Sequence, residues 1–152
     1  MPAHTRLAAD LTTDLFRTVG RFRRQLRRTA GGSFAGVTES QAELLRLVGR
    51  QPGISVREAA QELGLAANTA STLVSKLTAD DLLVRSTDAA DRRIGRLHLT
   101  EPAQQLADQT RAARRAALGA VLNQLDDEQI DSLTKGLNIL AEMTQMLQEG
   151  QP

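Results

Sequence analysis

Cysteine is absent from the 152-residue sequence, and this absence excludes several classes of function. A chain without cysteine forms no disulfide framework, no thiolate metal site and no thiol-based redox switch. Aromatic residues are also scarce, at 2% of the sequence, with three Phe and neither Trp nor Tyr. Proteins that bind single-stranded nucleic acid stack its bases on aromatic side chains, so this mode of binding is disfavoured.

Long apolar runs are lacking as well. No stretch approaches the roughly 20 apolar residues that span a bilayer, and the N-terminus lacks the apolar segment of a signal peptide. We therefore expect a cytoplasmic protein with no membrane partner. No nucleophile–base pair, phosphate-binding loop or cluster of metal ligands occurs at usable spacing, which argues against an enzyme, a cofactor and a bound metal.

The formal net charge is only +1, but the charges are unevenly distributed along the chain. Residues 1–28 carry seven Arg against two Asp, whereas residues 126–152 carry one Lys against six acidic residues. The two ends of the chain therefore attract one another on average. A second basic group, formed by Arg92, Arg93 and Arg96, is the candidate phosphate-facing feature.

Helical periodicity is strongest at the two ends of the chain. Apolar residues recur at three- and four-residue steps from Leu7 to Leu26, which predicts a long first helix that ends at a Gly-Gly pair. Residues 100–123 predict another long helix with Thr100 as its N-cap, and Asp126 begins a last helix with an apolar stripe.

The region between these helices contains two capping-box patterns and a turn. Thr38, with a glutamine three residues later, predicts the start of a second helix, and Ser55, with a glutamate three residues later, predicts a short third helix over residues 55–63. Gly64 permits a tight turn into a fourth helix. The buried face of that fourth helix is expected to consist of Ala70, Leu73, Val74 and Leu77.

The opposite face of the fourth helix presents short hydrogen-bonding side chains and one long cation. These are Asn68, Thr69, Ser71, Thr72, Ser75 and Lys76. Two strands near residues 83–85 and 97–99 flank a polar loop, residues 86–93, that forms a wing. A polar helix fits the major groove and an arginine on a hairpin reaches the minor groove, so this order predicts a winged helix-turn-helix directed at duplex DNA.

The order of the elements, together with the stretch LGL…T.S.LV.KL…LLVR…D..DRR…L.LT, resembles the MarR family of bacterial transcriptional regulators over essentially the whole chain. The resemblance implies a mainly α fold with a small β wing. It implies a winged helix-turn-helix DNA-binding lobe at residues 36–100 and a helical dimerisation region at residues 1–30 and 101–152. Two recognition helices of a homodimer would then meet a pseudo-palindromic operator about 34 Å apart, which is one turn of B-DNA.

The same resemblance assigns roles to individual residues. The exposed face of the fourth helix would contact bases and phosphates in the major groove, with Ser75 on that face. In the wing, Asp91 would orient Arg93 toward the minor groove. Further phosphate contacts are expected from Arg92, Arg96, Ser40 and Gln41, the last two at the start of the second helix.

The chain departs from the family pattern at three positions. Ala66 stands where a Ser or Thr cap is usual, Thr72 where an Arg is frequent, and Asp81 where Gly commonly makes the turn into the wing. The missing cap weakens the fourth helix by about 1 kcal/mol. An aspartate can still adopt the left-handed conformation at modest cost, so the turn at Asp81 is retained.

The resemblance further implies a repressor that is released by a small aromatic or anionic effector held near helices one, two and five. The sequence assigns no effector-contacting residue. The alternative from a different class is a winged helix that serves as a protein-interaction module without sequence-specific DNA binding. Such a module calls for an apolar or acidic recognition face, whereas the face here is polar and mildly basic.

Overall fold

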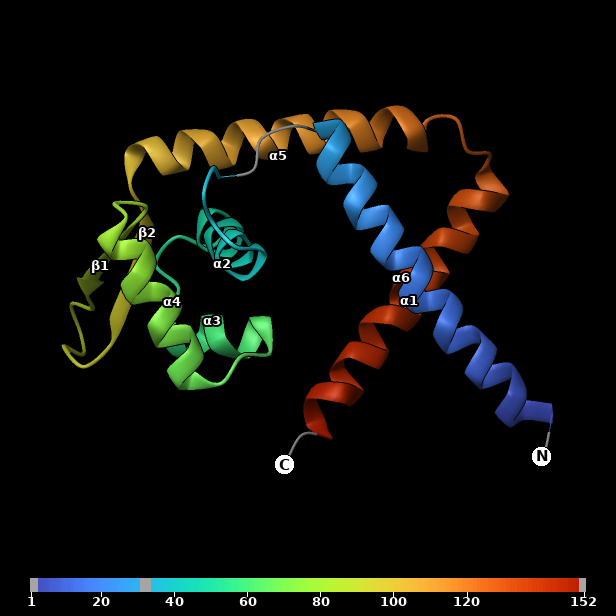
Figure 1. Cartoon of the computed structure of the whole chain (residues 1–152), viewed down its shortest axis with the longest axis horizontal. Coiled ribbons are helices and arrows are strands. Elements are labelled where there is room, and N and C mark those ends of the chain that lie inside the picture. Colours follow the sequence, from blue (N-terminus) through green and yellow to red (C-terminus); the bar gives the residue numbers. More distant parts are fainter. Residues whose placement is uncertain (1–2, 31–33, 151–152) are drawn as a thin grey trace.

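The computed structural model describes residues 3–30 and 34–150, and within them it contains six helices and one two-stranded sheet (Figure 1). In chain order the elements are α1 (Ala3–Ala30), α2 (Glu39–Arg50), α3 (Val56–Leu63), α4 (Ala67–Ala79), β1 (Leu83–Thr87), β2 (Gly95–Leu99), α5 (Glu101–Leu122) and α6 (Asp127–Glu149). The predicted fold class, mainly α with a small β wing, is confirmed.

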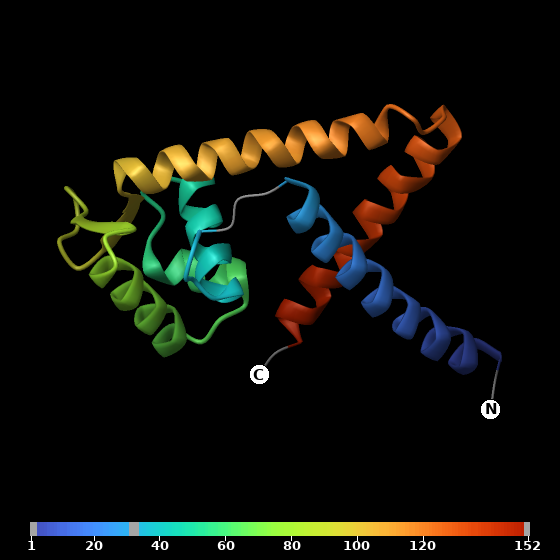
Figure 2. The same ribbon diagram turned by 45° about the horizontal axis from the view of Figure 1, so that its top comes forward.

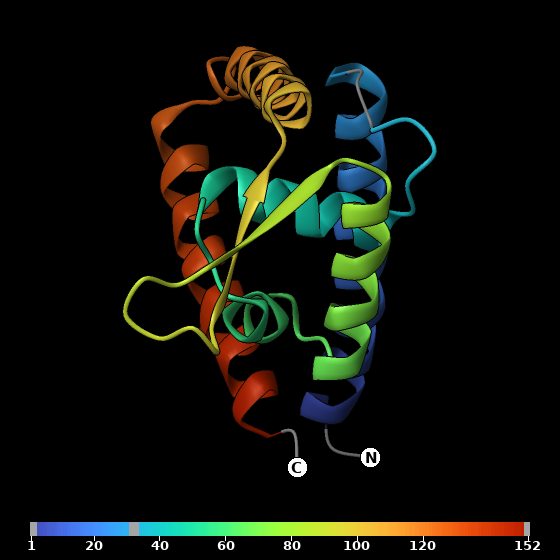
Figure 3. The same ribbon diagram turned by 90° about the vertical axis from the view of Figure 1, so that its left-hand side faces the viewer.

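The long helix α5 connects two differently built parts of the molecule (Figures 1 and 2). The helices α2, α3 and α4 and the β1–β2 hairpin gather beside the N-terminal half of α5. The helices α1 and α6 extend away from α5 toward the N- and C-termini. They cross in the view of Figure 1, but the side view of Figure 3 shows them on opposite sides of the molecule.

Local sequence signals begin three of the helices. At α2, the hydroxyl of Thr38 accepts the backbone N–H of Gln41, and Oε1 of Gln41 accepts the backbone N–H of Thr38. This reciprocal box satisfies two of the four N–H groups that a helix leaves unpaired at its start. Equivalent boxes begin α3 and α6, at Ser55 with Glu58 and at Asp126 with Gln129.

The turns and helix caps follow the sequence predictions, except at Thr100. Gly64 ends α3 at φ 64°, and Asp81 leads into β1 at φ 57°, so the aspartate does take the left-handed conformation. As expected, Ala66 gives α4 no side-chain cap. Thr100 occupies the N-cap position of α5 but does not cap it, because its hydroxyl donates to the carbonyl of Asp81 at 2.9 Å instead.

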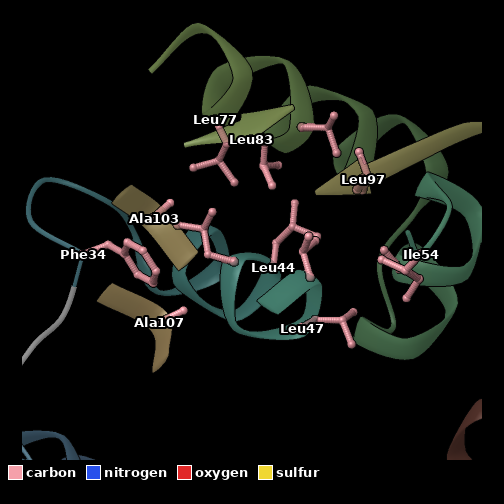
Figure 4. Packing of buried hydrophobic residues seen from close by; sticks show 13 residues of the cluster. Phe34, Leu44, Leu47, Ile54, Leu77, Leu83, Leu97, Ala103 and Ala107 are labelled. Atoms are coloured by element: carbon pink, nitrogen blue, oxygen red, sulfur yellow. The ribbon is translucent and has the colours of Figure 1, made fainter. Parts of the chain in front are cut away.

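The hydrophobic core lies where α2 meets the hairpin, α4 and the start of α5 (Figure 4). The hairpin is antiparallel, with Leu83 opposite Leu99 and Thr87 opposite Gly95, and this register turns Leu83 and Leu97 into the core. The largest fully buried side chains are Leu44, Leu45, Leu47, Val48, Leu77, Leu83 and Leu97. This core fixes α4 and the wing relative to each other.

The helices α1 and α6 contribute little to that core. No residue of α6 is buried, and none is buried among residues 8–30 of α1. Both helices nevertheless carry large apolar side chains, including Phe16 at 78% exposure and Leu147 at 71%. In the part of the chain that the structure describes, no helix has the length and apolar character needed to cross a membrane.

Candidate nucleic-acid interface

The helix α4 presents the polar face that the sequence predicts. Its inner side is held in the core by Ala70, Val74 and Leu77, each at most 2% exposed. Because these positions recur at helical spacing, the polar residues between them point to solvent, while Leu73 is partly buried against the core. The exposed set consists of Asn68, Thr69, Ser71, Thr72, Ser75 and Lys76.

Hydrogen bonds within α4 already engage some of these side chains. The carbonyl oxygen of the Asn68 side chain accepts the N–H of Thr69 at 2.8 Å, and the hydroxyl of Thr72 donates to the carbonyl of Asn68 at 2.9 Å. The ammonium of Lys76 lies 3.1 Å from a carboxylate oxygen of Asp80 one turn later. This pair is exposed, so water and salt screen it and Lys76 can exchange it for a phosphate.

The wing tip is built around one carboxylate, that of Asp88. Its Oδ1 accepts the backbone N–H groups of Ala90 at 2.8 Å and Asp91 at 3.0 Å, and its backbone N–H donates to the carbonyl of Ile94. The backbone N–H of Asp91, then the side-chain bond from Arg96 and the N–H of Ala90, hold the pKa of Asp88 below its usual value. Asp88 therefore stays ionised and keeps the tip closed.

Arg92 and Arg93 both lie exposed at this tip. Asp91 contacts Arg93 through the backbone, because Oδ1 of Asp91 accepts the N–H of Arg93 at 3.0 Å. The carboxylate thus fixes the direction in which the Arg93 side chain leaves the chain, without pairing with its guanidinium. The Arg93 side chain is exposed at the tip of the hairpin.

Arg96, the third arginine of the basic group, points back toward the body of the lobe. Its Nε donates to Oδ2 of Asp88 at 2.8 Å, and its Nη1 lies 3.3 Å from the carbonyl of Gly53 and 3.5 Å from Oε2 of Glu58. The guanidinium is therefore surrounded by acceptors from the protein. Sequence reasoning missed this arrangement, because Glu58 is distant in the chain and gives no local signal of contact.

Ser40 and Gln41 lie in the first turn of α2, away from the core of this surface. Ser40 is exposed, whereas Gln41 is half-buried and its side-chain oxygen is used in the capping box. Their phosphate contact stays a prediction. Among the described residues, no group of three or more His, Asp or Glu side chains is placed to hold a metal ion.

A second polar cluster lies between α1, α2 and α5. Oε1 of Glu39 lies 2.9 Å from Arg46, 3.3 Å from Arg27 and 3.5 Å from Arg23, and Arg23 also pairs with Glu43. Partial burial alone would raise the pKa of Glu39, but the Arg46 hydrogen bond and the three positive charges outweigh it and lower the pKa. One carboxylate thereby links α1 to α2.

Beside this cluster is a cavity of about 190 Å³ with a strongly cationic lining. Its charged lining residues are Arg46, Arg50, Arg111, Arg114 and Arg115, with Leu26 and Leu118 among the apolar ones. Nε of Arg114 is buried and has no hydrogen-bond partner among the described residues. Burial lowers the pKa of Arg114, and the charges of Arg46, Arg27 and Arg23 lower it further, while Glu39 acts in the opposite direction.

The segment with this geometry matches a known family model. The match extends over residues 35–94, which include α2, α3, α4 and the wing tip, and the family is described as the MarR family. Residues 35–94 are therefore similar to the MarR family. The resemblance predicted from the sequence is thus confirmed. No curated protein matches the chain in sequence.

Solved structures extend the likeness to most of the chain. A crystal structure of FabT from Streptococcus pneumoniae in complex with DNA has a TM-score of 0.75 and 21% identity, covering 95% of this chain and 99% of that chain. A MarR-family protein from Bacillus stearothermophilus has a TM-score of 0.71 and 21% identity, covering 93% and 97%. A crystal structure of the transcriptional regulator PcaV from Streptomyces coelicolor in complex with its natural ligand has a TM-score of 0.62 and 22% identity. It covers 84% of this chain and 89% of that chain. At these identities the matches show the fold, a winged helix with long helices at both ends.

Proposed function

We propose that this chain is a homodimeric regulator of transcription that binds a pseudo-palindromic operator in duplex DNA. The observation that carries the proposal is the joint placement of the polar face of α4 and the exposed Arg92 and Arg93 on one rigid lobe. An α-helix of this polarity fits the major groove, and an arginine beyond it reaches the minor groove. FabT, a structural neighbour, was crystallised with DNA.

The helices α1 and α6 support the dimer. Leu133, Leu137 and Leu147 recur on one face of α6 and are 41%, 56% and 71% exposed, and α6 buries no residue against its own chain. Exposed apolar side chains gathered on one helix face mark an interaction surface. The opposite net charges of the two chain ends favour an occupant that is a second copy of the chain, with α1 of one protomer near α6 of the other.

Within this proposal Arg93 enters the minor groove and Arg92 contacts phosphates. The exposed face of α4 contacts base edges and phosphates, and Lys76 releases Asp80 to do so. Arg96 supports the wing, because its guanidinium already meets Asp88, Glu58 and the Gly53 carbonyl.

The test is fluorescence anisotropy with the full chain and a labelled duplex that carries the DNA upstream of its own gene. We expect affinity to fall steeply with salt, and Arg93→Ala to weaken binding by about 5- to 100-fold and to lower the salt slope by about one. Arg17→Ala is the control, since Arg17 pairs with Asp14 on α1, far from the lobe surface. Binding insensitive both to salt and to Arg93→Ala would contradict the proposal and favour the protein-interaction module.

The cationic cavity supports release of DNA by a small organic anion. Five arginines and the unpartnered Nε of Arg114 offer donors to a carboxylate, and Leu26 and Leu118 offer an apolar wall. An anion there would compete with Glu39 for Arg46, the residue common to both groups. That competition would leave Glu39 to pair with Arg23 and Arg27 of α1 alone and so change the contact between α1 and α2. In the proposed dimer this contact influences the spacing of the two lobes.

Benzoate is the probe for anion binding in the cationic cavity, and benzyl alcohol is an uncharged control of similar size. We expect benzoate alone to raise the melting temperature and to weaken DNA binding. Arg114→Met should abolish both effects, while Arg57→Met, on the exposed side of α3, should leave them intact. If benzoate and benzyl alcohol change the melting temperature and DNA binding equally, there is no anion site at Arg114. The same holds if benzoate acts equally on Arg114→Met and Arg57→Met.

A further inference from the structure

A short extended segment fastens the wing to the start of α3. The backbone N–H of Gly53 donates to the carbonyl of Leu97 at 2.8 Å, and the N–H of Leu97 donates to the carbonyl of Ile54 at 2.9 Å. Ser55 and Arg96 form an isolated antiparallel bridge at the same place. The linker between α2 and α3 therefore lies along β2 and brings the first turn of α3 next to Arg96.

Side chains extend this contact toward the wing tip. Arg96 lies between two carboxylates from different elements, Asp88 in the wing and Glu58 in α3. Glu58 is itself fixed, because its Oε2 accepts the backbone N–H of Ser55 at 2.8 Å in the α3 capping box. Asp88 is fixed too, since its second oxygen holds the backbone of the tip.

These contacts form one continuous path from α3 to Arg93. It runs from Glu58 through Arg96 to Asp88, from Asp88 to the N–H of Asp91, and from the Asp91 carboxylate to the N–H of Arg93. Every step is a hydrogen bond or an ion pair of 3.5 Å or less. We call Glu58, Arg96 and Asp88 the wing brace.

We propose that the wing brace sets the angle between the wing tip and the helix-turn-helix, so that Arg96 and Asp88 act as positioning residues for Arg93. The inference rests on the proposed DNA-binding function. A hairpin loop samples many orientations, and holding it in the bound one before association lowers the entropic cost of binding. A side chain that must enter a groove about 6 Å wide profits from such pre-organisation.

A general stabilising role for the brace predicts a different outcome. Arg96 keeps 32% of its side chain exposed and Glu58 keeps 57%, and ion pairs at such sites contribute little to global stability. Loss of the brace should therefore release the tip locally and leave the unfolding transition of the whole lobe almost unchanged.

The first experiment measures the tip without DNA. Asp88→Asn keeps an oxygen for the backbone N–H groups but removes the charge that faces Arg96. Under native conditions we expect trypsin to cut after Arg92 and Arg93 about tenfold faster in this variant, because cleavage follows the population of the opened loop. Asp108→Asn, which removes a carboxylate on α5, is the control. An unchanged cleavage rate in Asp88→Asn would overturn the brace, whether or not the chain binds DNA.

The second experiment is a double-mutant cycle on DNA affinity with Asp88→Asn and Arg93→Ala. If the brace acts through Arg93, Asp88→Asn should weaken binding about fivefold in the parent chain and have no effect in the Arg93→Ala background. Additive losses would show that Asp88 does not act through Arg93 and would overturn the positioning role. If the parent chain fails to bind any duplex, the proposed function fails, and the trypsin result still decides on the brace itself.

Discussion

Two regions of the molecule differ in the exposure of their apolar side chains. One is the lobe formed by α2, α3, α4 and the hairpin, and the other is the pair of end helices, α1 and α6. In the lobe, Leu45, Leu77 and Leu97 have no exposed surface, whereas Leu137 and Leu147 of α6 are 56% and 71% exposed. Burial of apolar area is the main favourable contribution to folding. The lobe therefore has its own hydrophobic core, whereas the end helices bury little apolar area against their own chain. In the proposed dimer a second copy of the chain covers them.

This contrast also separates two roles in recognition. The lobe holds the polar face of α4 and the wing in one fixed geometry, which a DNA-contacting surface requires. In the proposed dimer, the end helices determine how far apart two such lobes lie. The cationic cavity and the Glu39 cluster lie between the two regions, where a ligand could alter their relation.

The largest expected effect comes from the core of the lobe. Leu45→Ala should lower the free energy of unfolding by about 2–5 kcal/mol, since it opens a cavity in a fully buried position. Val84→Ala, on the exposed side of β1, should stay within about 0.5 kcal/mol. Urea unfolding followed by circular dichroism measures both. A similar loss in the two variants would show that the buried core does not set the stability of the lobe.

The next effect concerns the end helices. Leu137→Glu places a charge in the exposed apolar face of α6 and should raise the dimer dissociation constant by about tenfold or more. Asn138→Glu adds the same charge to the adjacent, polar side of the helix and is the matched control. Sedimentation velocity over a range of concentrations gives both constants. Equal association of the two variants would mean that this face is not the dimer interface.

A smaller effect compares capped and uncapped helices inside the lobe. Thr38→Ala removes the capping box of α2 and should cost about 1 kcal/mol, whereas Ala66→Ser should gain about 1 kcal/mol for α4. The gain is expected because Ala66 already has the extended backbone conformation of an N-cap, with φ −64° and ψ 147°. Thermal unfolding checks the two signs, and destabilisation by Ala66→Ser would show that the cap geometry is not available.

The smallest effect depends on pH and on the link between the two regions. The pKa of Glu39 is lower in the folded chain than its ordinary value of 4.5, so its stabilising contribution is present above that value and is lost as pH falls through the folded pKa. Glu39→Gln should therefore be less stable than the parent near neutral pH, and the difference should vanish in acid. Unfolding midpoints from about pH 6 to about pH 3.5 test this. A difference that does not depend on pH would assign the effect to packing.

Sequence reasoning succeeded where the signal was local. The boxes at Thr38 and Ser55, the turn at Gly64 and the left-handed Asp81 each depend on residues within a few positions, and all four are found in the structure. The face of α4 followed from its 3.6-residue period, because the core residues fix which side is exposed.

Contacts between distant segments were beyond that reasoning. Thr100 has the sequence of an N-cap, but the fold brings the carbonyl of Asp81 within 2.9 Å of its hydroxyl. The contacts of Arg96 with Glu58 and the Gly53 carbonyl depend on segments distant in the chain, so its place in a basic group did not reveal them, and its phosphate contact stays a prediction. The cavity arginines come from two helices whose relative position no local pattern specifies.

The central claim is that two self-contained lobes bind DNA at a spacing set by the dimer. Its most direct test is to select, from a random pool, the duplexes that the 152-residue chain binds. We predict an enriched inverted repeat whose half-site centres lie about one helical turn apart, roughly 10 base pairs. An enriched single half-site, or recovery of no common sequence, would contradict the account.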